Sequence, residues 1–233
     1  MENWMSALPE ELWDVPLTDL AIPGSHDAMS YCLDIRSPLV RSEPDCFRLL
    51  DAFCCCFTRS VIFKWATTQD KSIEDQLSLG VRYFDLRIAH KQNDPSSDLY
   101  FTHVLYTHLT VLETLMSVAA WLKSHPKEVI ILACSHFEGI SEQLHEAFIF
   151  SIKKIFGSKL CPRKETDLSL RSCGRLGTKL FCPTKTNGSP THRAVAEHPY
   201  WWANQKQQPA SQTTWTIRRS LGDQRASLCL GST

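Results

Sequence analysis

Three side chains of this sequence are of the types that cleave phosphate diesters: His26, Arg87 and His103. Histidine has an ordinary pKa near neutrality, so one imidazole can accept a proton from an attacking hydroxyl while another donates a proton to the leaving oxygen. The planar guanidinium of arginine is well shaped to neutralise charge on the phosphorus oxygens. Asp27 follows the first histidine directly, and Asp85 stands two positions before the arginine. The set is typical of a phosphodiester-cleaving site.

Each of these side chains is predicted to lie at or near the end of a short strand. An apolar run at 17–22 predicts a buried strand that delivers the first histidine at its C-terminal edge, after a proline and a glycine. The run 81–88 predicts a second strand, in which Asp85 and Arg87 share a face because they are two positions apart. An aromatic-rich run at 99–105 predicts a third strand with the second histidine near its end. The active sites of α/β barrels are built from strand ends in this way.

The rest of the pattern alternates between helices and strands. The stretch between the first strand and Thr68 is predicted to be irregular. Helical and strand patterns then predict helices at 70–79, 110–124 and 141–156, and strands at 128–134 and 178–182. This alternation predicts an α/β fold made of β/α units.

Three short motifs resemble a known family in their type and order. They read AIPGSHDA at 21–28, YFDLRIAH at 83–90 and THVLYT at 102–107. In this order they resemble the X domain of phosphatidylinositol-specific phospholipase C (PI-PLC). The resemblance implies a TIM-type (β/α)8 barrel over 1–204, clearest over 4–163.

The later part of such a barrel is predicted to be missing. A complete barrel takes about 250 residues and at least roughly 200. After Arg163, only the run at 178–182 is predicted to be a further strand. The tail at 205–233 is rich in Gln, Ser and Thr and has no sustained apolar face, so it is predicted to be divergent and disordered. The sequence therefore predicts an incomplete barrel, with its first half clear.

The resemblance implies a role for each residue of the set. His26 would be the general base that activates the inositol 2-hydroxyl, and His103 the general acid that protonates the departing diacylglycerol oxygen. Arg87 would stabilise the pentacoordinate phosphorus, Asp27 would hydrogen-bond within the cluster, and Asp85 would orient its neighbours. The family's late carboxylate, which pairs with the first histidine, has no counterpart that the sequence identifies.

Two further positions bear on substrate and metal binding. Ser135 stands where related proteins carry a basic residue that contacts inositol or phosphate, and neighbouring His136 is expected to point to the opposite face. Arg87 stands where the calcium-dependent members of the family supply a carboxylate. A guanidinium there would repel a divalent cation and can replace it electrostatically, so a site without metal or cofactor is predicted.

Composition narrows the possible partners. The 25 basic and 25 acidic residues balance, which favours neither nucleic acid nor strong attraction to anionic lipid. The start has no signal-peptide pattern, and no apolar run approaches the ~20 residues of a transmembrane helix. Ten cysteines without C-x-x-C spacing suggest reduced thiols, not disulfides or a zinc site. We expect a cytoplasmic protein that contacts phosphatidylinositol-type phospholipid peripherally at a membrane surface.

Several alternatives stay open at this point. Cys54, Cys55 and Cys56 fit either acylation or a buried thiol cluster. The pair Trp201-Trp202 fits either an interfacial anchor or aromatics packed in a loop. For function, a phosphoric diester hydrolase competes with a catalytically inactive remnant that binds lipid headgroups or a protein. A metal-dependent phosphohydrolase would need more His and Asp ligands than the one His-Asp pair supplies.

Overall fold

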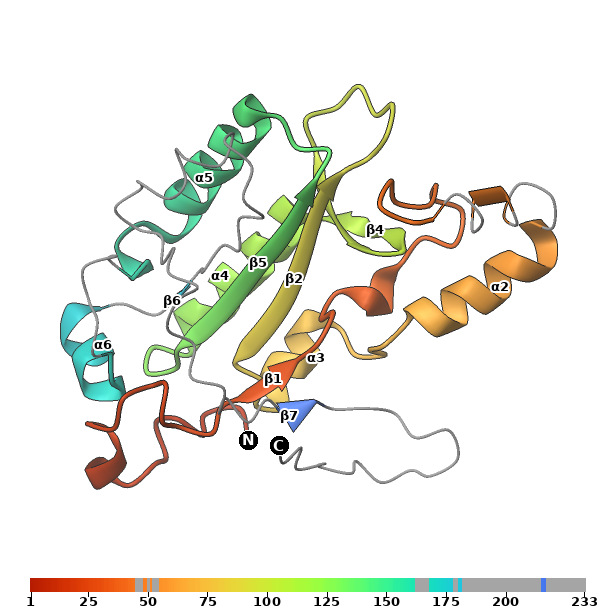
Figure 1. The fold of residues 1–233 in the computed structure, drawn as a ribbon. Coiled ribbons are helices and arrows are strands. Elements are labelled where there is room, and N and C mark those ends of the chain that lie inside the picture. Colours follow the sequence, from red (N-terminus) through yellow and green to blue (C-terminus); the bar gives the residue numbers. More distant parts are fainter. Residues whose placement is uncertain are drawn as a thin grey trace.

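The described part of the chain is a curled, open sheet with helices on its outer side (Figure 1). The computed structural model describes residues 1–44, 48–49, 51, 55–161, 168–177, 180–181 and 215–216. In chain order the elements are η1 (Glu10–Leu12), β1 (Pro23–Ser25), η2 (Ser30–Cys32), α2 (Cys55–Ala66), α3 (Ile73–Ser78), β2 (Tyr83–His90), β3 (Leu99–His103), β4 (Leu105–Thr110), α4 (Val111–Ser124), β5 (Ile130–Glu138), α5 (Glu142–Phe156), η3 (Gly157–Lys159), α6 (Leu170–Leu176), β6 (Leu180–Phe181) and β7 (Trp215–Thr216).

Parallel pairing around β2 builds the sheet. β1 pairs with the start of β2, with Ser25 opposite Phe84, and β5 pairs along the length of β2. β6 continues the sheet beyond β5, and β7 pairs with the other edge of β1, both in parallel. The described strands therefore form part of a barrel wall and not a closed (β/α)8 barrel.

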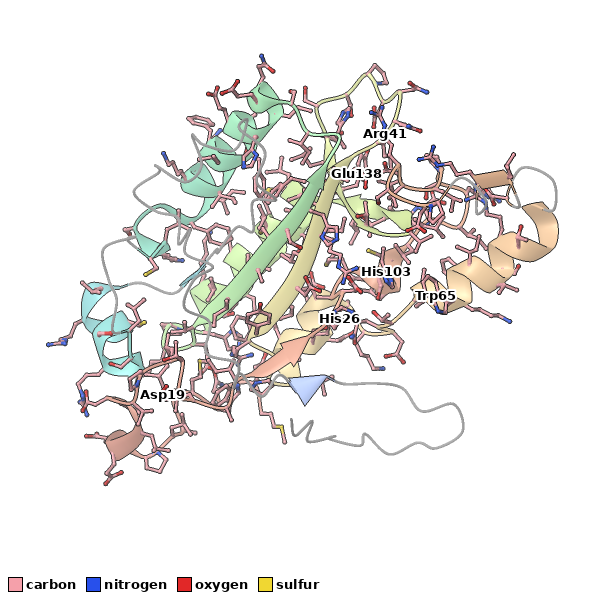
Figure 2. The ribbon with its side chains drawn as sticks, in the orientation of Figure 1. Asp19, His26, Arg41, Trp65, His103 and Glu138 are labelled. Atoms are coloured by element: carbon pink, nitrogen blue, oxygen red, sulfur yellow. The ribbon has the colours of Figure 1, made fainter. Side chains whose placement is uncertain are left out.

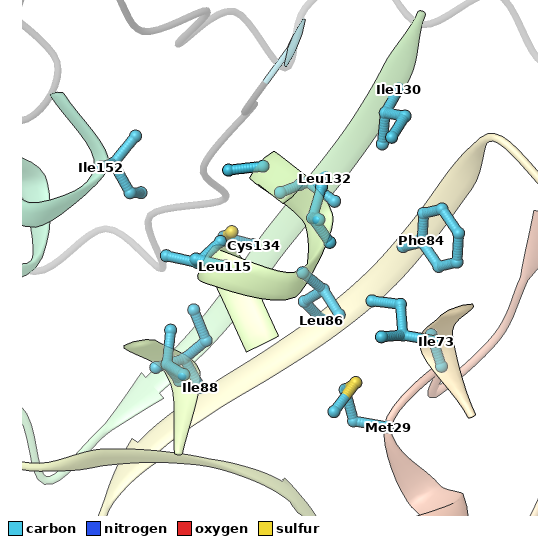
Figure 3. Close-up of a cluster of buried hydrophobic side chains, with 14 of the residues drawn as sticks. Met29, Ile73, Phe84, Leu86, Ile88, Leu115, Ile130, Leu132, Cys134 and Ile152 are labelled. Atoms are coloured by element: carbon cyan, nitrogen blue, oxygen red, sulfur yellow. The ribbon is translucent and has the colours of Figure 1, made fainter. Parts of the chain in front are cut away.

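Alternation along β2 and β5 separates the core from the site. One set of side chains on each strand packs against α3, α4 and α5 in the main hydrophobic cluster (Figure 3). The buried side chains of these two strands include Phe84, Leu86, Ile88, Ile130, Leu132 and Cys134. Burial of each large apolar side chain contributes about 1.5–3 kcal/mol. The intervening residues of β2, which include Asp85 and Arg87, face the other side of the sheet.

Helix ends lie where local capping predicts them. Thr110 Oγ1 accepts the Glu113 N–H at 3.2 Å, and Glu113 Oε2 accepts the Thr110 N–H at 2.7 Å, which forms a capping box at the start of α4. Ser141 caps α5 by accepting the Leu144 N–H at 3.3 Å. The predicted helices at 110–124 and 141–156 are confirmed, and the one at 70–79 is shorter, at Ile73–Ser78.

A buried ion pair attaches the N-terminal segment to the start of β2. The Arg82 and Glu128 side chains are 0% and 1% exposed, and Arg82 Nη2 lies 2.9 Å from Glu128 Oε2. Glu128 Oε1 also accepts the backbone N–H of Ser6 at 3.0 Å and its hydroxyl at 3.1 Å. The guanidinium lies 4.6 Å from the centre of the Trp121 ring. This one pair therefore joins the N-terminus, β2 and α4.

The predicted strand at 17–22 is wrong, because the strand begins where it was expected to stop. β1 consists of Pro23, Gly24 and Ser25, and the Pro23 carbonyl accepts the Arg82 N–H at 2.9 Å. Leu17 and its apolar neighbours pack in a separate cluster with residues near α6. The apolar run reflects this packing and not strand pairing.

The single strand predicted at 99–105 is also wrong. Val104 adopts a φ of +66°, which interrupts the extended backbone and divides the region into β3 and β4. β3 runs antiparallel to the end of β2, with Phe101 opposite Ile88, and β4 runs antiparallel to β3. An antiparallel hairpin therefore replaces a β/α unit here.

The remaining predictions concern regions that differ from expectation or lie partly outside the described residues. The stretch predicted to be irregular up to Thr68 contains α2. Of the strand predicted at 178–182, the structure describes Leu180–Phe181, which form β6 and pair in parallel with β5. Of the predicted tail, only β7 is described, and Cys54 and the pair Trp201-Trp202 lie outside the described residues. Among the helices that are described, none is long and apolar enough to cross a bilayer.

Candidate active site

The predicted site residues converge where three strands meet. His26 and Asp27 follow β1, Asp85 and Arg87 lie on β2, and His103 ends β3. Figure 2 labels the two histidines of this set, His26 and His103. Asp27, Asp85, Arg87 and His103 line one pocket. β3 reaches this place because it folds back along the end of β2. The sequence therefore placed these side chains together correctly, although the third strand runs in the opposite direction from a barrel strand.

The Asp27 carboxylate is the centre of the cluster. Its side chain is 1% exposed, and its Oδ1 lies 2.6 Å from Arg87 Nε. Its Oδ2 lies 3.0 Å from His26 Nε2 and 3.3 Å from His103 Nε2. The backbone of Asp27 has a φ of +46°, a left-handed conformation that aspartate and asparagine tolerate better than most residues. One carboxylate thus holds both imidazoles and the guanidinium.

The protonation of Asp27 reflects two opposing effects. Burial raises the pKa of its carboxyl above the ordinary value of 3.8, and the positive charges of His103, Arg87 and His26 lower it. Burial is the larger effect, so the group binds its proton more tightly than a free aspartate does. The cationic neighbours are what allow the carboxylate to ionise in this buried place.

Asp85 is the carboxylate partner of the first histidine. Its Oδ2 lies 3.0 Å from His26 Nδ1 and accepts the Asp27 backbone N–H at 3.4 Å. The same oxygen is 3.7 Å from Arg87 Nη2. The His26 ring thus has a carboxylate oxygen 3.0 Å from each of its nitrogens, Asp85 Oδ2 at Nδ1 and Asp27 Oδ2 at Nε2. The sequence predicted an orienting role for Asp85, but it identified no partner for His26.

Residues at the end of α2 contact the second histidine. His103 Nδ1 lies 2.6 Å from the Ala66 carbonyl, which can only accept a hydrogen bond, so Nδ1 carries the proton. The Trp65 ring stacks on the imidazole, with the ring centroids 5.9 Å apart and the planes 22° from parallel. Sequence reasoning missed both residues because it predicted no element there.

The segment after α2 contacts the first histidine as well. Gln69 Nε2 donates to the His26 carbonyl at 3.0 Å, and the Thr68 hydroxyl donates to the same oxygen at 3.3 Å. The backbone N–H groups of Thr68 and Gln69 both donate to Ser30 Oγ, at 3.1 and 3.0 Å. Four residues of this segment thus contact the two histidines: Trp65 and Ala66 contact His103, and Thr68 and Gln69 contact His26.

Ser135 lies beside the site, but His136 does not point away from it as expected. Ser135 pairs in register with Arg87, and its hydroxyl lies 3.1 Å from His136 Nδ1, so the two side chains share one side. Strand alternation fails because His136 and Phe137 adopt φ values of +71° and +52°. Partial burial and the positive charge of Arg87 lower the pKa of His136. The His136 imidazole thus lies beside Ser135, the position at which related proteins were expected to carry a basic side chain.

The site also contains groups that could hold a metal ion. His26, Asp27 and Asp85 each place a ligand atom within 4.8 Å of the others. The Arg87 guanidinium contacts both carboxylates, at 2.6 Å and 3.7 Å. A fixed positive charge on the same oxygens competes with a divalent cation. The residues present fit an arginine-neutralised site better than a cation site.

Sequence comparison identifies the family. A family model described as PI-PLC X 1 matches residues 60–164. PI-PLC X domain-containing protein 2 from Homo sapiens is 32% identical over 94% of this chain and 69% of its own length. This chain belongs to the PI-PLC X domain family. PI-PLC X domain-containing protein 1 is 46% identical in Homo sapiens and 44% identical in Danio rerio, each over 87% of this chain. The chain spans 63% and 66% of the lengths of these two relatives.

Solved structures with the PI-PLC name share the fold. A mutant of phosphatidylinositol-specific phospholipase C from Staphylococcus aureus aligns with a TM-score of 0.56 and 22% identity, over 81% of this chain and 54% of that one. Phosphatidylinositol-specific phospholipase C from Listeria monocytogenes aligns with a TM-score of 0.52 and 25% identity, over 79% of this chain and 57% of that one. This PI-PLC X domain thus matches about half of each bacterial enzyme.

Proposed function

We propose that this PI-PLC X domain is a phosphoric diester hydrolase of the phosphatidylinositol-specific phospholipase C type. The observation that carries the proposal is that His26, His103 and Arg87 all contact the one buried carboxylate of Asp27. The substrate would be a phosphatidylinositol-type lipid, reached by peripheral contact with a membrane surface from the cytoplasm. Membership in the family supports this choice of substrate.

The geometry suggests a direct path for the two protons. His26 Nε2 takes the proton of the inositol 2-hydroxyl, whose oxygen then bonds to phosphorus. The bond from phosphorus to the diacylglycerol oxygen breaks, and His103 Nε2 gives that oxygen a proton. Diacylglycerol and a cyclic inositol phosphate result, while Arg87 neutralises charge on the remaining phosphorus oxygens. Each proton-transfer group contributes about 10²–10⁴-fold.

Hydrolysis of phosphatidylinositol in mixed micelles tests this function directly. We expect the purified chain to release inositol phosphate and the His26→Ala variant to lose about 10²–10⁴-fold in rate, because His26 is the group proposed to take the 2-hydroxyl proton. His108→Ala is the matched control, since His108 has a 65% exposed side chain that lies 3.8 Å from Asp34, and it is not among the residues that line the pocket. We expect it to retain the wild-type rate.

The alternative function is a binding domain without catalysis. If a folded, monodisperse wild-type sample releases no inositol phosphate, the proposed activity is wrong. Retained binding of phosphatidylinositol vesicles would then favour a headgroup-binding remnant.

Metal independence is a separate expectation. Because Arg87 already supplies a positive charge to Asp27 and Asp85, excess chelator should change the rate of hydrolysis by less than about twofold. The measurement is inositol phosphate release with EDTA, and then with calcium restored in excess. A rate that collapses with chelator and recovers with calcium would assign His26, Asp27 and Asp85 to a cation instead.

A further inference from the structure

One exposed aromatic side chain contacts His103, although it is not one of the candidate site residues His26, Asp27, Asp85 and Arg87. Trp65 lies in the last turn of α2, the helix that projects away from the sheet in Figure 1. Figure 2 shows it at the end of α2 nearest to His103 and His26. Its indole is 65% exposed, although one of its faces stacks on the His103 imidazole. A tryptophan left this open contributes little to the core, so its contact with His103 calls for another explanation.

We propose that Trp65 is a positioning residue for His103, acting with the adjacent Ala66 carbonyl to hold the imidazole so that its transferable proton is the one on Nε2. This inference rests on the proposed role of His103 as the general acid. It adds a residue from α2, for which the sequence predicted no role.

The hydrogen bonds of His103 define which proton can leave. The Ala66 carbonyl, 2.6 Å from Nδ1, retains the proton on that nitrogen before and after transfer. Nε2 faces the Asp27 carboxylate at 3.3 Å, on the side of the ring that lines the pocket. When the protonated imidazole donates from Nε2, the neutral ring that remains is the Nδ1–H form, which the carbonyl already stabilises. The bond to Ala66 therefore fixes the direction of transfer.

The stacked indole presents its π surface to the imidazole. The ring centroids lie 5.9 Å apart and the planes are 22° from parallel, and an aromatic face in this position attracts a positive charge. Among the described residues, the charged groups that line the pocket with this ring are Asp27 after β1 and Asp85 and Arg87 on β2, and His26 contacts the same Asp27 carboxylate. None of these groups changes when Trp65 is replaced, so an effect of the replacement on proton transfer can be assigned to the stack.

The test compares Trp65→Ala, Trp65→Phe and Val61→Ala in the full chain. Phenylalanine keeps a ring that can stack, and Val61, one helical turn earlier and 52% exposed, is the control for apolar surface on α2. The substrate is a short-chain phosphatidylinositol below the concentration at which it forms micelles, and vesicles of phosphatidylinositol serve in parallel. Nitrogen NMR of labelled histidine reports the protonation and tautomer of His103 without need of activity.

We expect Trp65→Ala to lower kcat on the soluble substrate about 3- to 10-fold, with the alkaline limb of the pH profile moved to lower pH. Its NMR signals should show a less firmly held Nδ1–H tautomer. Trp65→Phe should stay within about twofold of the wild type, and Val61→Ala should leave the soluble reaction unchanged.

Two outcomes would overturn the proposal. If Trp65→Ala loses activity only on vesicles, with an unchanged pH profile and NMR spectrum, the indole serves to anchor the protein and not to position the acid. If the wild type hydrolyses neither substrate, the proposed function fails, and an unchanged His103 tautomer in Trp65→Ala would independently reject the positioning role.

Discussion

Replacing Asp27 with asparagine should lower the rate of phosphatidylinositol hydrolysis by about 10²–10⁴-fold. Arg87, His26 and His103 all contact this carboxylate, at 2.6, 3.0 and 3.3 Å. An amide has nearly the same shape but no charge, so it cannot hold two imidazoles and a guanidinium in place. Asparagine also tolerates the positive φ of this position, so the backbone need not move. The measurement is kcat in the micelle assay.

The stability of the same variant separates catalysis from folding. Burial raises the pKa of Asp27 above 3.8, so the folded chain binds this proton more tightly than the unfolded chain does. The contribution of this group to the free energy of unfolding is therefore greatest at low pH, and it decreases as the pH rises from about 4 through the raised pKa. Asparagine does not ionise. The Asp27→Asn protein should gain stability relative to the wild type over that interval, as urea unfolding at a series of pH values would show.

An Asp27→Asn protein with the wild-type rate would remove the carboxylate from the mechanism. If Asp27→Asn is less stable than the wild type at neutral pH but not at pH 4, the ion pairs of Asp27 stabilise the fold by more than the burial of its charge destabilises it.

Replacing Glu128 with alanine should lower the free energy of unfolding by about 3–5 kcal/mol. The substitution leaves the buried Arg82 guanidinium without its ion-pair partner, and it removes the acceptor of the Ser6 backbone N–H and one of the two acceptors of the Ser6 hydroxyl. Removing one partner of a buried ion pair leaves an uncompensated charge and strongly lowers stability. Replacing both partners by well-packed apolar residues often has little effect on stability. Urea unfolding at neutral pH is the measurement.

The control for this variant is Asp14→Ala. Asp14 lies 2.8 Å from Arg171, but the two side chains are 67% and 40% exposed. Exposed pairs contribute about 0–1 kcal/mol, so this variant should unfold close to the wild type. Equal losses for the two variants would mean that solvent reaches the Arg82–Glu128 pair.

Local patterns were sufficient to predict how some of the candidate site residues are placed. Asp85 and Arg87 share a face because strand alternation depends only on near neighbours, and His26 follows directly after a strand in the structure as well. The α4 and α5 boundaries were predictable because their caps are formed by residues three positions apart.

Contacts between distant parts of the chain were not predictable in this way. The Ala66 carbonyl reaches His103 across 37 positions, and Asp85 reaches the Asp27 backbone across 58. No spacing rule connects such positions. Backbone conformation was the second obstacle: Val104 and His136 are ordinary residues in extended patterns, yet both have positive φ and redirect the chain.

During synthesis, the ion pair between Arg82 and Glu128 and the contacts of Glu128 with the N-terminal segment can form only after residue 128 has been made. Ser6 is 122 positions from the glutamate that binds it. At about 5–20 residues per second, the ribosome needs on the order of 6–24 s to make the intervening residues. Until then Trp4 and Met5 lack the later part of the cluster in which they pack, which includes Val129, Cys161 and Leu168, and they are more accessible to chaperones or to other nascent chains. A change at Glu128 would therefore first be seen as a lower yield of newly made protein, before any effect on hydrolysis.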